Sequence, residues 1–312
     1  MGVGGVAALL TRRRAANQRP PWQEPPHPVV QAIKALVLVV IAVVMIFPFI
    51  YVIAVSFSSY RDVIGGGLII FPGHPTLDAY RTILRGDIIT QALIVSIGIT
   101  TIGTALKLLA TVTMAYALTR TGPGGVRGSR FVLIVVLFTL LFSPGLIPRY
   151  LVVKELNMLD TYASLVLPGL ISAFNLVVLR NFFMNIPQEL LDSARIDGAN
   201  DLRILWNIVL PLSKAVLAVI ALFYGVALWN DFFAATLYLN DPRKWPIQLV
   251  LRQYVLLGSP LVSETREMNQ PLPPPQTIQM AVLVVATVPI LLVYPLLQKY
   301  FTKGVLTGAI KG

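Results

Sequence analysis

Long apolar stretches that are almost free of charge alternate with shorter polar segments along the chain. A helix needs about 20 mainly apolar residues to cross the hydrocarbon core of a bilayer, so these stretches predict membrane-spanning helices. Six are long enough: about 35–55, about 88–118, the segment between Arg130 and Arg149, the segment between Asp160 and Arg180, about 215–239 and about 278–297. We expect an all-α, polytopic membrane protein with six transmembrane helices.

The composition is that of a membrane protein rather than a soluble domain. Of 312 residues, 56% are hydrophobic and 12% are charged, and the mean hydropathy is +0.75. The charged share is about half that of ordinary globular domains. These values exclude disordered, collagen-like and disulfide-rich secreted proteins.

The 25 Lys and Arg residues indicate an orientation. With both termini inside, fifteen lie on the cytoplasmic side and nine in the outer loops, while Lys107 lies within the second predicted span. Basic residues concentrate in cytoplasmic loops, so both termini are predicted to be cytoplasmic. The same distribution accounts for the net charge of +11 without a nucleic acid as partner.

The predicted domain organisation is simple. Residues 1–33 contain five prolines and are expected to form a flexible cytoplasmic tail. Their apolar run precedes the arginines, which reverses the order found in a secretory signal. Residues 34–300 form the six-helix membrane domain, with a cytoplasmic loop at 185–213, and residues 301–312 form a cytoplasmic carboxyl-terminal tail.

Several chemistries have little support in the sequence. There is no cysteine, and the two histidines, His27 and His74, lie in predicted loops, so a metal site or a membrane-embedded enzyme is hard to build. The glycines at 122–128 lack the Lys and hydroxyl of a phosphate-binding loop, so they predict a flexible inner turn. We expect no catalytic residue, no metal and no cofactor bound by this chain.

The loop at 185–213 carries the most information. Pro187 suits the first turn of a helix, and Glu189 there faces the positive end of the helix dipole. Gly198 suits a left-handed helix stop, Asn200 or Asp201 can cap a second helix, and Pro211 ends it. The sequence therefore predicts two short helices joined at Gly198.

Such a pair of helices has two other interpretations. A DNA-binding helix-turn-helix is disfavoured, because four acidic residues in the pair would repel phosphate. An amphipathic loop resting on lipid headgroups stays open.

The spacing of Asp192-Ser193-Ala194, Gly198, Ile208, Leu210 and Pro211 resembles the Glu-Ala-Ala loop of permease subunits in binding-protein-dependent ABC importers. The chain departs from that pattern with Asp192 in place of Glu and Ser193 in place of the first Ala. Residues 196–199, 228–232 and 305–312 further resemble the carbohydrate-uptake branch, near the maltose-type and oligosaccharide-type permeases.

The resemblance implies the six-helix core of a type I ABC importer permease in a prokaryotic cytoplasmic membrane. It also implies a second homologous permease, two ATPase subunits that bind ATP and Mg, an external solute-binding protein docking on loops 58–87 and 240–277, and a carbohydrate substrate moved by alternating access. The tail from Lys299 is expected to touch an ATPase.

The resemblance further implies which residues couple the chain to the ATPase. Leu190 and Leu191 would fill the contact, and the small Ala194 and Gly198 would allow close approach. The expected coupling residues are Glu189, Leu190, Leu191, Asp192, Ser193, Ala194, Arg195, Asp197, Gly198, Ala199, Ile208, Leu210 and Pro211.

Two charges within the predicted spans need an explanation, because a charge near the bilayer centre is costly. Lys107 can extend towards the inner edge of its long span. Asp231 lies beside Trp229, Asn230 and Phe232, a combination suited to a sugar-binding cavity, although an interhelical polar contact explains it equally well. The same two titratable groups keep an ion-coupled secondary transporter as the alternative function.

Overall fold

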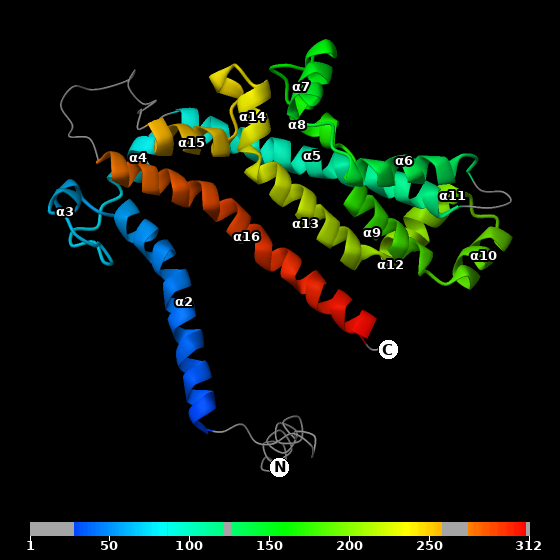
Figure 1. The fold of residues 1–312 in the computed structure, drawn as a ribbon, viewed down its shortest axis with the longest axis horizontal. Coiled ribbons are helices and arrows are strands. Elements are labelled where there is room, and N and C mark those ends of the chain that lie inside the picture. Colours follow the sequence, from blue (N-terminus) through cyan, green and yellow to red (C-terminus); the bar gives the residue numbers. More distant parts are fainter. Residues whose placement is uncertain (1–27, 86, 121–125, 258–273, 310–312) are drawn as a thin grey trace. The chain divides into compact units, whose positions relative to one another are not determined.

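The computed structural model describes residues 28–85, 87–120, 126–257 and 274–309. Every regular element in these residues is a helix (Figure 1), so the predicted all-α class is confirmed. The chain divides into two compact units, residues 1–51 and residues 52–312. Most of α2 (Pro28–Ser56) belongs to the first unit, where its side chains from Pro28 to Ile50 are exposed. Because that stretch is strongly apolar, it requires lipid or another protein around it.

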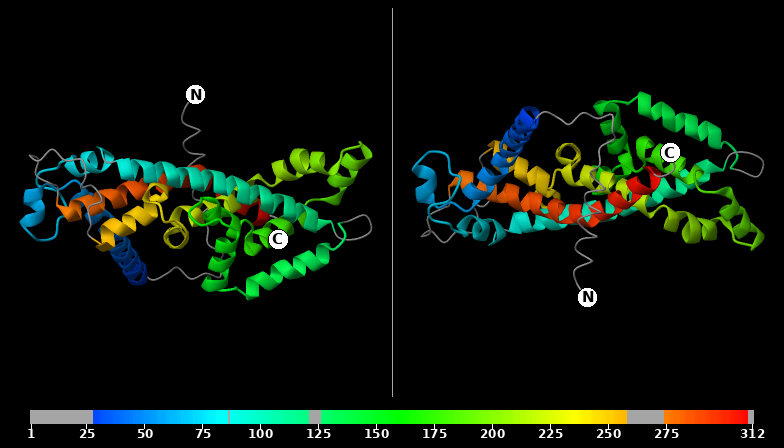
Figure 2. Two further views of the ribbon diagram at one scale, coloured as in Figure 1. Left: turned by 90° about the horizontal axis from the view of Figure 1, so that it is seen from above. Right: turned by 90° about the horizontal axis from the view of Figure 1, so that it is seen from below.

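The second unit is organised around two long helices that lie side by side, α5 (Asp87–Thr119) and α13 (Lys214–Asn230) (Figure 1, Figure 2). α9 (Ala173–Met184) packs on α5, and α16 (Pro275–Ala309) packs on α13. Ala115, Leu176 and Ile220 are fully buried where α5, α9 and α13 meet. This core supports the loop that the sequence singles out.

Three of the six predicted spans are continuous helices long and apolar enough to cross a membrane, and they lie in α2, α5 and α16. The predicted fourth span is bent by 53° between the segment that ends with η1 (Leu167–Gly169) and α9. Pro168 removes a backbone donor at the bend, which explains the interruption. The described residues thus confirm a membrane protein with several apolar helices.

The other two predicted spans are shorter in the structure than in the sequence analysis. α6 (Ser129–Leu141) has 13 residues, about 20 Å of helix, and is followed by a break at Pro144 and Gly145 before α7 (Leu146–Glu155). Gly145 has a φ of 79°, which a helix cannot accommodate. α13 ends before Asp231, and α14 (Phe232–Tyr238) follows in place of the end of the predicted fifth span.

Two helix ends differ from the predicted domain limits. α2 already begins at Pro28, within the segment expected to be a tail, and α16 continues through residue 309. Residues 1–27 and 310–312 lie outside the described residues. The cytoplasmic orientation of both termini stays a prediction.

Short helices connect the long ones. Their bounds are α3 (Tyr60–Ile64), α4 (Asp78–Arg85), α8 (Ala163–Val166), α10 (Gln188–Ile196), α11 (Asp201–Ile204), the π-helical turn η2 (Leu205–Val209), α12 (Leu210–Leu212), η3 (Pro242–Lys244) and α15 (Ile247–Leu257).

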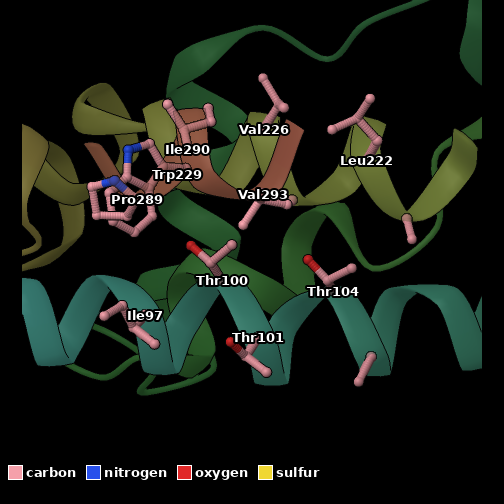
Figure 3. Close-up of a pocket in the computed structure, with 13 residues that line it drawn as sticks. Ile97, Thr100, Thr101, Thr104, Leu222, Val226, Trp229, Pro289, Ile290 and Val293 are labelled. Atoms are coloured by element: carbon pink, nitrogen blue, oxygen red, sulfur yellow. The ribbon is translucent and has the colours of Figure 1, made fainter. Parts of the chain in front are cut away.

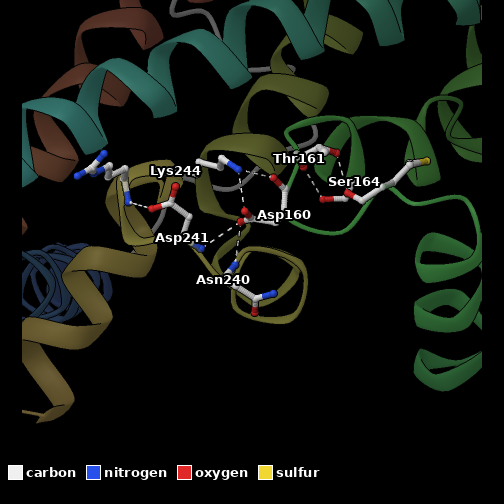
Figure 4. A network of polar contacts seen from close by, with 8 residues as sticks. Asp160, Thr161, Ser164, Asn240, Asp241 and Lys244 are labelled. Atoms are coloured by element: carbon white, nitrogen blue, oxygen red, sulfur yellow. Dashed lines mark hydrogen bonds and ion pairs between the residues drawn. The ribbon is translucent and has the colours of Figure 1, made fainter.

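Two of the predicted outer segments are held by acidic side chains. The backbone N–H of His74, together with its imidazole, lowers the pKa of Asp62 to about 2 and closes the segment that follows α3. Asp160 accepts hydrogen bonds from the backbone N–H groups of Asn240 and Asp241 and from Lys244 Nζ (Figure 4). Each carboxylate therefore joins residues that are distant in sequence.

Candidate functional site

The predicted pair of short helices is present as α10 and α11, joined at Gly198. The N–H of Gly198 donates to the carbonyl of Arg195 at 3.0 Å, and that of Ala199 donates to the carbonyl of Ala194 at 2.9 Å. This Schellman pattern needs a left-handed residue, and Gly198 has a φ of 77°. Gly198 is therefore a helix stop, as predicted, and it sets the direction of α11.

The cap of the second helix is Asn200. Its Oδ1 accepts a hydrogen bond from the backbone N–H of Arg203 at 2.9 Å, which satisfies one of the free donors at the start of α11. Asp201, the other candidate, forms an ion pair with Arg120 instead. The residues Asp201–Leu212 then turn by 85° into α13.

The loop is attached to the helical bundle by apolar contacts with α5 and α9. Leu191, Ile204, Leu205 and Val209 are buried in one cluster with residues of α5 and α9. Beside this cluster, Arg180 Nε donates to the carbonyl of Leu118 at 3.0 Å. The loop is therefore packed directly against the ends of α5 and α9.

The burial of Leu191 corrects one expectation. Leu191 was expected to fill a contact with an ATPase, but it is 9% exposed and packs against the core of this chain. Ala194 also packs partly against the same cluster. A Cβ at Gly198 would meet nothing within 4 Å, so the glycine serves backbone conformation within this chain rather than close internal packing.

The outward face of the loop carries other apolar side chains. Leu190 is 45% exposed, Ile196 86%, Leu202 66% and Trp206 58%. Leu202 and Trp206 are four positions apart, and so are the buried Leu205 and Val209. Both pairs therefore have helical spacing, and the sequence does not reveal which of them is buried. Glu189, Ser193, Asp197 and the Asp192–Arg195 ion pair are exposed on α10 and its end. The remaining motif residues Leu210 and Ile208 pack partly on the core, and Pro211 is exposed in α12.

Of the four residues predicted to line a sugar cavity, Trp229 alone lines a cavity among the described residues. Trp229 lines a cavity of about 410 Å³ between α5, α13 and α16, together with Thr100 and Thr104 (Figure 3). The Oγ1 atoms of both threonines are buried and have no hydrogen-bond partner among the described residues. Trp229 Nε1 donates to the carbonyl of Ala286 at 3.2 Å, which fixes the ring.

The three residues after Trp229 do not line this cavity. Asn230 is exposed and its Nδ2 donates to the carbonyl of Val226, while Asp231 Oδ1 accepts from the N–H of Ala234 and caps α14. Phe232 lies under the guanidinium of Arg252, 5.2 Å from the ring centre. Asn230 is the last residue of α13, and after the helix break Asp231 and Phe232 belong to the start of α14.

Lys107 also lies where the sequence did not predict it. It is 8% exposed, inside the chain, and does not extend to the surface. Its Nζ lies 5.8 Å from the centre of the Tyr224 ring. Among the described residues no group of three or more His, Asp or Glu side chains could hold a metal ion.

Residues 4–307 match the family described as "Binding-protein-dependent transport system inner membrane component". The chain belongs to this family. It is a membrane component of a transport system, as the resemblance in the Glu-Ala-Ala loop implied.

Relatives of this inner membrane component are transport permeases. The chain is 50% identical over 276 residues to the "Polygalacturonan/rhamnogalacturonan transport system permease protein YtcP" of Bacillus subtilis, covering 88% of this chain and 96% of that protein. It is 28% identical to the "Arabinooligosaccharides transport system permease protein AraQ" of Halalkalibacterium halodurans, over 87% of this chain and 93% of that protein.

A solved structure has the same fold. It is described as a bacterial ABC transporter involved in the import of the acidic polysaccharide alginate. The TM-score is 0.82 at 29% sequence identity, and the alignment covers 90% of this chain and all of that one.

Proposed function

We propose that this chain is the non-catalytic permease subunit of an ABC importer that moves an acidic oligosaccharide across a prokaryotic cytoplasmic membrane. The exposed face of α10 and α11 docks on an ATPase subunit, where ATP and Mg bind. Alternating access then follows from movement of this loop together with α5 and α9.

The observation that carries this proposal is the contrast between the two faces of the loop. Leu191 and Ile204 anchor it to the core, whereas Ile196, Leu202 and Trp206 are exposed at 58% or more. Large apolar side chains gathered on an exposed element mark an interaction surface. An element anchored on one face and open on the other can transmit a partner's movement into the bundle.

The relatives support the substrate class. The name of the Bacillus subtilis relative refers to polygalacturonan and rhamnogalacturonan, and the similar solved importer takes alginate, an acidic polysaccharide. Polymers of uronic acids carry carboxylates. An acidic oligosaccharide therefore fits this chain better than a neutral one.

The partners that we propose for this chain are those that its family implies. The exposed apolar side chains of α6, including Phe131, Ile134 and Phe138, suit lipid or a second homologous permease. An external solute-binding protein would deliver the sugar to the outer segments that Asp62 and Asp160 stabilise. This chain would bind no nucleotide itself.

The coupling surface can be tested by co-purifying the tagged chain with its native companions, followed by mass spectrometry. Ile196→Glu places a charge on the exposed face without touching the core, so it should reduce recovery of the ATPase subunits about tenfold or more. Phe71→Glu, at an equally exposed apolar residue of a predicted outer segment, is the matched control and should leave their recovery unchanged.

Two outcomes would contradict the proposal. Recovery of ATPase subunits by Ile196→Glu at the level of the control would place the ATPase contact elsewhere. Uptake that persists after ATP depletion, with the chain recovered alone, would favour an ion-coupled secondary transporter.

A further inference from the structure

An exposed apolar loop begins in the last turn of α3 (Figure 1). Residues 63–73, which we call the apolar loop, read VIGGGLIIFPG and contain no charged or hydrogen-bonding side chain. Phe71 is 86% exposed, and Ile64 and Leu68 are each 63% exposed. Large apolar side chains gathered on one exposed segment mark a surface that another molecule covers.

The apolar loop is closed at its base by Asp62 and His74. The backbone N–H of His74 donates to Asp62 Oδ2 at 3.0 Å, and its Nδ1 lies 3.2 Å from Asp62 Oδ1. The backbone N–H of Ser59 donates to the same carboxylate at 3.3 Å. Because both ends of the loop meet at one side chain, the loop extends at most about 20 Å from its base.

This base lies beside the end of α2. The backbone N–H of Thr76 donates at 2.8 Å to the carbonyl of Phe57, the residue that follows α2. Ser56 Oγ lies 2.8 Å from the hydroxyl of Tyr80 on α4, and the rings of Phe57 and Tyr80 are 4.9 Å apart. The residues on both sides of the loop are therefore attached to the end of this helix.

The end of α2 is expected to lie at a membrane surface. No charged residue occurs between Lys34 and Arg61. The helix from Ala35 to Ser56 is about 33 Å long, and the hydrocarbon core of a bilayer is about 30 Å thick. Tyr60 and Arg61, which are exposed and follow the end of the helix, suit the headgroup region. The apolar loop comes directly after them.

The composition of the loop favours lipid over a protein as its partner. Protein interfaces surround an apolar centre with polar side chains, and this loop offers none. Gly66 and Gly67 have φ values of 68° and 101°, so the backbone turns there without a side chain before the run of large apolar residues. The neighbouring acid, Asp62, is already bonded to His74, and Arg61 can approach lipid phosphate.

We propose that the apolar loop inserts into the membrane surface at which α2 ends, with Leu68 and Phe71 among the acyl chains just below the headgroups. Interfacial apolar segments insert about 5–10 Å, which is within the reach of this loop. The inserted loop holds the end of α2 and the start of α4 at a constant depth. This anchoring depends on the membrane position of α2, whatever the substrate is, and it leaves α4 free for the solute-binding protein.

The sequence contains no cysteine, so a single label can be placed at a chosen position. Phe71→Cys carries a nitrobenzoxadiazole fluorophore in the intact complex, with the cysteines of the companion subunits replaced by serine. The complex is placed in nanodiscs of phosphatidylcholine and phosphatidylglycerol. Arg81→Cys, at an exposed position of α4 outside the loop, is the matched control. Iodide quenches the label from water, and a doxyl group near the top of a lipid acyl chain quenches it from the membrane.

Without the solute-binding protein, the label at position 71 should be quenched by the doxyl lipid. It should be about fivefold less accessible to iodide than the label at position 81. Leu68→Cys should behave like Phe71→Cys, and it decides the question if Phe71→Cys assembles poorly. Asp62→Ala opens the base of the loop, so it should raise iodide quenching at position 71.

Three results would overturn the proposal. Equal iodide quenching at positions 71 and 81 would mean that the loop lies in water. Protection of position 71 from both iodide and the doxyl lipid would mean that a companion subunit covers it. Protection that begins only when the solute-binding protein is added would make the loop a docking surface for that protein.

Discussion

Arg120, the residue after α5, forms an ion pair with Asp201, the first residue of α11. The guanidinium also lies 5.3 Å from the centre of the Tyr116 ring on α5. The Arg120 side chain is 19% exposed and that of Asp201 is 58% exposed. The end of a long membrane helix is thus joined directly to the proposed coupling loop by a charge contact.

Breaking this contact should weaken coupling more than stability. Asp201→Asn should cost about 0.2–1 kcal/mol of stability, as for other largely exposed ion pairs, and should lower sugar-stimulated ATP hydrolysis about two- to fivefold. The physical reason is that α11 can then shift relative to α5. Thermal unfolding in detergent and ATPase assays of the reconstituted importer measure the two effects.

A charge reversal provides the control for this contact. Arg120→Asp combined with Asp201→Arg should recover part of the stimulated hydrolysis that either single change removes. Additive losses in the double variant would show that the pair does not connect the loop to α5.

Gly198 should tolerate only residues that adopt a left-handed conformation. Gly198→Ala is expected to cost about 1–2 kcal/mol, because an L-residue with a Cβ is strained at a φ of 77°. The strain should tilt α11 away from its position and reduce uptake, with ATP hydrolysis less affected. Uptake per ATP hydrolysed is the measurement.

Gly198→Asn is the matched variant, because Asn adopts the left-handed region more readily than Ala. It should retain more uptake than Gly198→Ala, although its side chain is larger. Since a Cβ here meets no atom of this chain, the opposite ranking would mean that contact with a partner, rather than φ, determines the requirement for glycine.

The contact between Asp160 and Lys244 should give the outer segment a pH-dependent stability. The hydrogen bond from Lys244 lowers the pKa of Asp160, and the same bond raises the pKa of Lys244. The carboxylate therefore stabilises the fold above its ordinary value of 3.8 and loses this effect as the pH falls through its lowered pKa. The amine stabilises the fold below 10.5 and loses this effect as the pH rises through its raised pKa.

Asp160→Asn tests this contact with little change in shape. Asp160 has a φ of 57°, which Asn accepts, and an amide oxygen can still accept from Asn240 and Asp241. The variant should increase amide hydrogen exchange in residues 240–244 about two- to fivefold at neutral pH. It should also remove the pH dependence of that exchange near the pKa of Asp160 and near that of Lys244. Asp160→Ala should have a larger effect, because it also loses the bonds from Asn240 and Asp241. Equal exchange in Asp160→Asn and in the unaltered chain would mean that the lysine contact contributes nothing.

Local interactions are what the sequence predicts well. The apolar content of α2, α5 and α16 indicates membrane helices whatever surrounds them, because the backbone must satisfy its own hydrogen bonds in lipid. The stop at Gly198 and the cap at Asn200 also depend on residues within about four positions. Such features can be read before any tertiary contact is known.

The sequence did not predict which segments that are distant along the chain contact each other. Leu190 and Leu191 look equivalent in the sequence, yet only Leu191 meets the core that α5 and α9 form. Lys107 was expected to extend towards the inner edge of its span, but Tyr224 and Gly169, more than 60 positions away, enclose it. Asp231 was placed within a span and instead caps α14.

The sequence by itself therefore determined the all-helical membrane class and the pair of short helices joined at Gly198. Only the tertiary structure decided which side of that loop is buried and which charges become enclosed. The physical reason is that hydrophobic periodicity fixes how a segment folds locally, whereas burial depends on the side chains that other segments bring to it.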